Sequence, residues 1–251
     1  MVEIIRLPQL KIHHFFVSNS APTVNKIFGY NTHFRNMKMS RYKNACAGNT
    51  KKAMTLYRHN LRLSQEMFTV ISCFEVALRN AIDRKYIANL GNDWLRDSVA
   101  AGGRFSSKSF WVTQGIINGV LSDLGAYYTH PKLVAKMDFG FWRYLFAPNQ
   151  YRALGQTLLQ IFPAKPTSTP SVQYNQAYVF SELVKINDIR NRIAHHEPIC
   201  FQSANSLIDT TYARQHYNLI LQLFQWMNIN EAALLYGLDH INSVCDDIDS
   251  I

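Results

Sequence analysis

Apolar side chains recur at helical spacing along much of this 251-residue chain. The clearest series is spaced at i, i+4, i+7, i+11 and i+15 and consists of Met67, Ile71, Phe74, Leu78 and Ile82. This spacing predicts an amphipathic helix that buries one face. Residues 44–90 contain almost no helix breaker, and we expect two helical stretches there. Ser64 is the expected N-cap of the second stretch, and Gly91 is its expected stop.

The rest of the chain also favours helices. We expect an apolar helix from 110 to near His130 and Pro131, a bend at 139–142, a proline-rich loop at 163–171, a long helix from Asn175 to about His196, and a last helical pair at 210–227 and 230–238. Pro198 disfavours helical geometry at Glu197 and should end the long helix. Because no strand-like alternation and no fixed repeat occur, short strands are expected only within 1–40. The pattern predicts an all-α fold, with one domain at 37–251 and an N-terminal extension at 1–36.

The charge balance points to a polyanionic partner. The chain has 26 Lys and Arg against 17 Asp and Glu, a net charge of +9, with 47% hydrophobic residues. This composition is that of a globular protein, and its positive charge favours nucleic acid among possible partners. The alternative is a merely basic surface without a specific partner.

The cysteines and the hydropathy pattern indicate the cellular compartment in which the protein is expected. Four cysteines, Cys46, Cys73, Cys200 and Cys245, are widely separated and contain no CxxC pair. This spacing favours the interpretation that the cysteines are reduced, buried thiols and not ligands of a zinc site or members of a disulfide framework. Neither a secretory signal nor an apolar run of membrane-spanning length is recognisable. We therefore expect a cytoplasmic protein without a membrane anchor.

Two charged residues fall on apolar helix faces. In the long helix, Arg190 projects about 20° from Val179, inside the stripe formed with Leu183 and Ile186. Glu75 projects about 40° from Ile71 on its own helix. An unpaired buried charge is costly, so a Glu75–Arg190 pair across two packed helices would explain both positions. The alternative is that each side chain is separately solvated at a helix edge.

A candidate reactive group follows Arg190 near the helix end. His195 lies five residues later, about 140° around an ideal helix, so the two side chains would meet only if the helix ends and His195 swings free. Asn191 lies four residues before His195 and can orient its ring by a hydrogen bond. Together these residues suit phosphodiester cleavage, in which His195 transfers protons and Arg190 stabilises charge on phosphate oxygens. Arginine and histidine are also common at helix ends for purely electrostatic reasons.

Several motifs in order resemble one protein family. The sequence RNRIAHH at 190–196 resembles the Arg-x4-His signature of HEPN-superfamily ribonucleases, with a polar residue directly after the arginine. The segments SRY at 40–42, AMTLY at 53–57, FEVALRNAI at 74–82 and DFGFW at 138–142 resemble elements of its Abi-like (abortive infection) branch. The resemblance extends from about Ser40 to Met227 and leaves 1–36 outside.

The resemblance implies a HEPN-like helical bundle with additional helices. It implies a homodimer in which two Arg-x4-His motifs form a composite active site, and a metal-independent endoribonuclease without a cofactor. The ribose 2′-hydroxyl would attack, as in toxins of phage defence or toxin–antitoxin systems, where an antitoxin protein is a further partner. Carried onto this chain, Arg190, His195 and Asn191 are the candidate catalytic residues. The candidate supporting residues are Glu75, Arg79, Asn80 and His196.

Other functions remain open at the level of sequence. The chain can be a non-catalytic HEPN module that binds RNA or protein. The pair His195 and His196 also suggests a metal-dependent phosphohydrolase, although neighbouring helical residues point about 100° apart and rarely share one ion. Three basic residues lie in expected loops and can either bind RNA phosphates or be solvated: Arg104, Lys108 and Lys165. Four aromatic residues are candidates for base stacking or for the core: Trp111, Phe141, Trp142 and Trp226.

Overall fold

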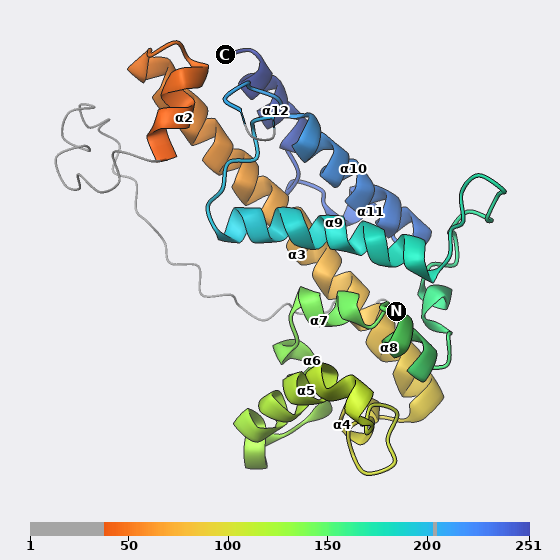
Figure 1. Ribbon diagram of the computed structural model, residues 1–251. Helices are drawn as coiled ribbons and strands as arrows, with labels where there is room; N and C mark the ends of the chain where they lie inside the picture. The colour runs from red at the N-terminus through yellow and green to blue at the C-terminus, as the bar shows by residue number, and fades with distance from the viewer. Residues whose placement is uncertain (1–37, 203–204) are drawn as a thin grey trace. The chain divides into compact units, whose positions relative to one another are not determined.

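The computed structural model describes residues 38–202 and 205–251 and confirms an all-α fold (Figure 1). Within these residues no sheet is formed, and the one isolated β-bridge joins Phe201 to Ile208. The chain divides into two units, Met1–Ser40 and Arg41–Ile251, with the boundary inside α2 (Lys38–Ala45). The expected extension at 1–36 lies outside the described residues, as do nearly all of the positions at which strands were expected.

The long helix α3 (Thr50–Leu90) is the central element of the second unit. Its 41 residues form one helix, so the prediction of two stretches with Ser64 as a cap is wrong. The N-cap is Asn49, whose side chain accepts a hydrogen bond from the Lys52 N–H at 3.1 Å. The predicted stop is confirmed, because Gly91 ends α3 with φ 100°, a conformation that favours glycine.

Three helices bury the apolar face of α3. They are α9 (Gln176–Ala194), α10 (Thr211–Trp226) and α12 (Ile241–Asp249), and Figure 1 shows α9 crossing α3. Phe74 of α3 packs edge-on against Phe224 of α10, with ring centroids 5.3 Å apart. Arg214 of α10 donates to Asp246 and Asp249 of α12, which ties these two helices together. The short helix α11 (Glu231–Leu234) connects them.

A group of shorter helices covers the C-terminal part of α3. It contains α4 (Trp94–Asp97), η2 (Lys108–Phe110), α5 (Trp111–Leu124), η3 (Gly125–Tyr127) and α6 (His130–Lys136). The apolar helix expected to reach His130 therefore ends earlier, at Leu124. Pro131 lies in the first turn of α6, where a missing N–H costs nothing, so this proline starts a helix and does not end one.

The DFGFW segment forms a helix, which corrects the prediction of a bend at 139–142. Asp138 is the N-cap of α7 (Phe139–Tyr144), and its Oδ1 accepts from the Phe141 N–H at 2.8 Å. A Cβ atom on Gly140 would lie 3.3 Å from Asp138 Oδ1 and 3.8 Å from Asn187 Oδ1 of α9. The contact with Asp138 would be tight and that with Asn187 an ordinary van der Waals contact, so glycine leaves room for the carboxylate that caps α7. The chain continues through α8 (Pro148–Ala153) and η4 (Leu158–Ile161) into the predicted loop at 163–171.

The core contains most of the aromatic side chains proposed for base stacking. Phe141, Trp142 and Trp226 are buried, whereas Trp111 at the start of α5 is 72% exposed. The four cysteines are free thiols, of which only Cys73 is not fully buried. In the described part of the chain, no helix combines the length and the apolar character that crossing a membrane requires.

Candidate active site

The C-terminal end of α9 is fixed by backbone hydrogen bonds. The His196 N–H donates to the Ile193 carbonyl at 2.9 Å, and the Glu197 N–H donates to the Arg192 carbonyl at 2.8 Å. This pair of bonds is a Schellman motif, with His196 in the left-handed position at φ 56°. His195 is the C-cap at φ −86° and ψ 9°. The expectation that His195 swings free once the helix ends is therefore wrong for its backbone, since the turn holds it in place.

Side chains hold the segment after α9 against the rest of the unit. Arg192 Nη2 donates to the Pro198 carbonyl at 2.7 Å, and its guanidinium lies 4.6 Å from the centroid of the Tyr212 ring. The Ile199 N–H donates to Asn60 Oδ1 of α3 at 2.9 Å. His195 and His196 between these anchors are both exposed. The imidazoles therefore project into solvent from a rigid support.

Arg190 lies where its apolar position in the sequence suggested, partly buried between helices. Its Nε is covered by protein and has no hydrogen-bond partner. Within the described residues, its guanidinium makes no hydrogen bond and no ion pair at 4.0 Å or less. The other two nitrogens, Nη1 and Nη2, are not among the buried unpaired atoms, so they remain accessible to solvent.

Glu75 and Arg190 interact electrostatically across the contact of α3 with α9, but their charged atoms are more than 4.0 Å apart. Burial raises the pKa of the Glu75 carboxyl, the Arg190 charge opposes this rise, Asp138 adds to it, and Arg79 opposes it. No ion pair within 4.0 Å joins Glu75 to another described residue. The predicted Glu75–Arg190 pair is thus an electrostatic interaction through a gap, and the prediction of direct pairing is wrong.

The other predicted supporting residues differ in their placement. Arg79 is four residues after Glu75, on the same face of α3, and its Nε is also buried without a partner. Asn80 is exposed, and its side chain makes no hydrogen bond to another described residue. Within this part of the structure, Arg79 therefore belongs with Glu75 and Arg190, and Asn80 does not.

A single chain does not join the three candidate catalytic residues by hydrogen bonds. The His195 N–H donates to the backbone carbonyl of Asn191 at 2.9 Å, but the Asn191 side chain makes no hydrogen bond to the His195 ring. The side chains of Arg190 and His195 leave α9 about 140° apart. Within one chain, the guanidinium thus faces α3 and the imidazole faces solvent elsewhere.

Sequence reasoning missed Asp138 as a neighbour of this site. The Asp138 carboxyl caps α7 and interacts electrostatically with Glu75. An aspartate directly before a short aromatic segment is a helix N-cap signal, and that signal was available in the sequence. What the sequence did not show is the packing of α7 against both α3 and α9, which brings Asp138 to Glu75.

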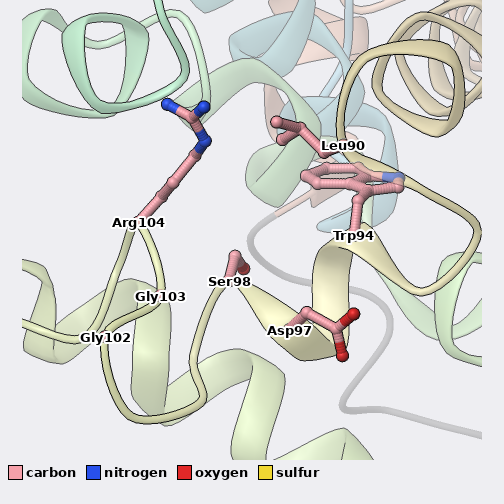
Figure 2. Close-up of a pocket in the computed structure, with 7 residues that line it drawn as sticks. All are labelled: Leu90, Trp94, Asp97, Ser98, Gly102, Gly103 and Arg104. Carbon is pink, nitrogen blue, oxygen red and sulfur yellow. The ribbon is translucent and has the colours of Figure 1, made fainter.

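Two cavities in the described residues lie away from this site. One, of about 380 Å³, is lined by Leu90, Trp94, Asp97, Ser98, Gly102, Gly103 and Arg104 (Figure 2). The other, of about 400 Å³, is bordered by Arg84, Lys85 and apolar residues of α3 and the 227–229 segment. Neither of these two cavities is lined by Arg190 or His195.

The basic loop residues make mainly local contacts. In Figure 2 the Arg104 side chain points away from Gly102 and Gly103, and its Nη1 donates to the Ala153 carbonyl at 2.9 Å. Lys165 Nζ donates to the neighbouring Pro166 carbonyl at 3.2 Å, and Lys108 is exposed. Across 38–202 and 205–251, no group of three or more His, Cys, Asp or Glu is arranged to hold a metal ion.

Comparison with known proteins gave no relative: no protein-family model, curated protein or solved structure matches this chain. The resemblance to Abi-like HEPN proteins therefore rests on the motifs of this sequence.

Proposed function

We propose that this chain is a metal-independent endoribonuclease of the HEPN type that acts as a toxin in phage defence or in a toxin–antitoxin system. The observation that carries the proposal is the end of α9. There, a Schellman turn holds His195 exposed, and Arg190, five residues earlier, keeps solvent-accessible nitrogens without a protein partner. A guanidinium without a carboxylate partner is available to a phosphate group.

The proposed chemistry needs a proton acceptor, a proton donor and a positive charge. His195 removes the proton from a ribose 2′-hydroxyl, and the 2′-oxygen forms a bond to the adjacent phosphorus. The bond from phosphorus to the 5′-oxygen breaks, and that oxygen takes a proton from water. Arg190 stabilises the charge that grows on the non-bridging oxygens. The products are a 2′,3′-cyclic phosphate and a 5′-hydroxyl.

A second copy of the chain would complete the site. Since Arg190 and His195 of one chain diverge on α9, a homodimer in which Arg190 of one copy approaches His195 of the other would bring the two groups together. A two-fold axis also doubles each group within one cleft. An antitoxin protein would then act by covering this cleft.

Incubation of the purified full chain with total cellular RNA in excess EDTA tests the proposal. We expect cleavage that leaves 5′-hydroxyl ends, and a rate lower by about a hundredfold or more in His195→Ala and in Arg190→Ala. Full activity of Arg190→Ala would contradict the assignment. Cleavage that EDTA abolishes would instead support a metal-dependent phosphohydrolase.

His196→Gly is the matched control for His195→Ala. Glycine suits the left-handed conformation at φ 56°, so this change removes an imidazole without straining the turn. We expect His196→Gly to cleave RNA at nearly the wild-type rate. Equal loss of activity in His196→Gly and His195→Ala would show that the role of His195 is wrongly assigned.

The second candidate is a non-catalytic HEPN module that binds RNA or protein. The divergence of Arg190 and His195 within one chain favours it, because a chain that acts alone would lack an assembled site. Under this alternative, RNA binds with steep salt dependence and is recovered intact.

A further inference from the structure

Three arginines have an Nε that is covered by protein and unpaired: Arg79, Arg143 and Arg190. The Arg143 guanidinium lies 5.4 Å from the centroid of the Phe180 ring, whereas Arg79 and Arg190 have no such contact in the described part of the chain. Arg192, Arg104 and Arg214 each donate to a carbonyl or a carboxylate. The guanidinium groups of Arg79 on α3 and Arg190 on α9 make no hydrogen bond and no ion pair at 4.0 Å or less within the described residues. Both are nevertheless partly buried, with each Nε covered by protein and unpaired. Partial burial without a partner costs free energy that a bound anion would recover.

Both guanidinium groups act electrostatically on one carboxyl. Both are within electrostatic range of Glu75, which is located on the same face of α3 as Arg79. The Nη atoms of both arginines remain accessible, because none is among the buried unpaired atoms. The oxygens of Glu75 are not among those atoms either, so each of the three side chains keeps polar atoms that are accessible to solvent.

We propose that Arg79 and Arg190 together form an oxyanion-binding site beside Glu75, and that its ligand is a backbone phosphate of RNA. The identity of the ligand rests on the proposed function, whereas the site itself does not require catalysis. Two planar guanidinium groups from different helices can each offer paired N–H donors to one tetrahedral anion. Arg79 is then a phosphate-binding residue in its own right, beyond a supporting role in helix packing.

The carboxyl of Glu75 makes the site dependent on pH. An ionised Glu75 repels an incoming anion, while a protonated Glu75 can donate its O–H to an anion oxygen. The charged neighbours of Glu75 are Arg79 on its own helix, Asp138 at the start of α7, and Arg190 on α9. We therefore expect anion affinity to rise as Glu75 takes up a proton, and Glu75→Gln to bind anions tightly without this dependence.

Sulfate is the probe that tests the site, because it stays doubly charged across the pH range in which carboxyls titrate. The full chain is titrated with sulfate by calorimetry at fixed ionic strength, beside Arg79→Ala, Arg190→Ala and the control Arg62→Ala. Arg62 also lies on α3 and is exposed. We expect each of the two site variants to lose about tenfold or more in sulfate affinity, and Arg62→Ala to match the wild type.

One further variant keeps the proposal testable if Arg79→Ala does not fold. Arg79→Lys keeps the charge and loses the planar donors, so it should bind sulfate more weakly than the wild type even if Arg79→Ala fails to fold. Sulfate affinity of Arg79→Lys and Arg79→Ala equal to that of Arg62→Ala would overturn the proposal.

Binding of a non-cleavable 2′-O-methyl RNA tests whether the anion that the site binds is an RNA phosphate. Log affinity falls linearly with log salt, and each phosphate contact with a single strand adds about 0.7 to the steepness of this fall. Arg79→Ala should therefore make the fall less steep by about 0.7, and Arg62→Ala should not change it. Sulfate binding without this change in slope would overturn the assignment of RNA phosphate as the ligand. The expected slope with this RNA, together with unmodified cellular RNA that the wild type leaves intact, would support the site and count against the nuclease function.

Discussion

At the scale of single residues, burial disfavours the charged form of the Glu75 carboxyl. Burial raises the pKa of its carboxyl more than the Arg190 and Arg79 charges lower it. The folded state therefore holds this proton more tightly than the unfolded state. The stability that Glu75 contributes is fully present below its unfolded-state pKa and is lost as the pH rises through its folded-state pKa.

Glu75→Gln should for this reason stabilise the protein at neutral pH. The amide cannot ionise, so the variant avoids the cost of a desolvated carboxylate at pH 7. The advantage should shrink toward about pH 4, where the carboxyl of the wild type is protonated in both states. Urea unfolding at several pH values measures this difference. Asp123→Asn, at a carboxyl whose side chain is 71% exposed, should show no such trend. A Glu75→Gln protein that is less stable at pH 7 than at pH 4, relative to the wild type, would contradict this account.

At the scale of helices, Asp83 connects three elements. Its Oδ1 accepts from Trp94 Nε1 of α4 at 2.8 Å and lies 2.7 Å from His130 Nε2 of α6. Trp94 and His130 are both buried, so removing Asp83 leaves their polar atoms without a partner.

Asp83→Ala should lower the free energy of unfolding by about 2–4 kcal/mol, as unpaired buried polar groups do. Asp123→Ala, which removes only an exposed pair with Lys136, should change it by less than about 0.5 kcal/mol. Urea denaturation of the two variants measures both effects. Since Asp83 lies two turns of α3 beyond Glu75, RNA cleavage by the folded Asp83→Ala protein should be unchanged. Equal stability of the two variants would show that the Asp83 contacts do not hold α4 and α6.

The helices also show which parts of the fold could be predicted from sequence. Apolar periodicity identified the helical segments, and Gly91 and Asn175 marked real helix ends. Ser64 was misread because a serine can lie inside a helix that is held by packing on both sides, and local sequence does not report such packing. Pro131 was misread because proline is compatible with the first turn of a helix as well as with its end.

The candidate site was predictable to a similar extent. The helical projections placed Glu75 and Arg190 on faces that do meet, because periodicity fixes the direction of a side chain on its helix. Periodicity does not fix the separation of two packed helices, so the absence of a direct ion pair could not be foreseen. Asp138 reaches Glu75 only through tertiary packing of α7. The left-handed conformation of His196 depends on how the chain leaves α9.

At the scale of the whole molecule, the net charge of +9 is compatible with a polyanionic partner, and the open question is how many chains form one active site. The two candidate catalytic side chains leave one helix in directions about 140° apart. If a site combines Arg190 of one copy with His195 of another, two inactive variants can restore each other.

Mixing Arg190→Ala with His195→Ala tests this assembly. A mixed dimer would contain one site with both residues intact and one site with neither. If half of the dimers are mixed, activity should return to about a quarter of the wild-type level.

Rates are measured with a fluorescent RNA before and after the chains exchange. The controls are each variant alone and a mixture of His195→Ala with the double variant Arg190→Ala/His195→Ala. That second mixture cannot form an intact site and should stay inactive. Failure of the first mixture to recover activity, when size measurements show mixed dimers, would place Arg190 and His195 of the same chain in one site and contradict the composite arrangement.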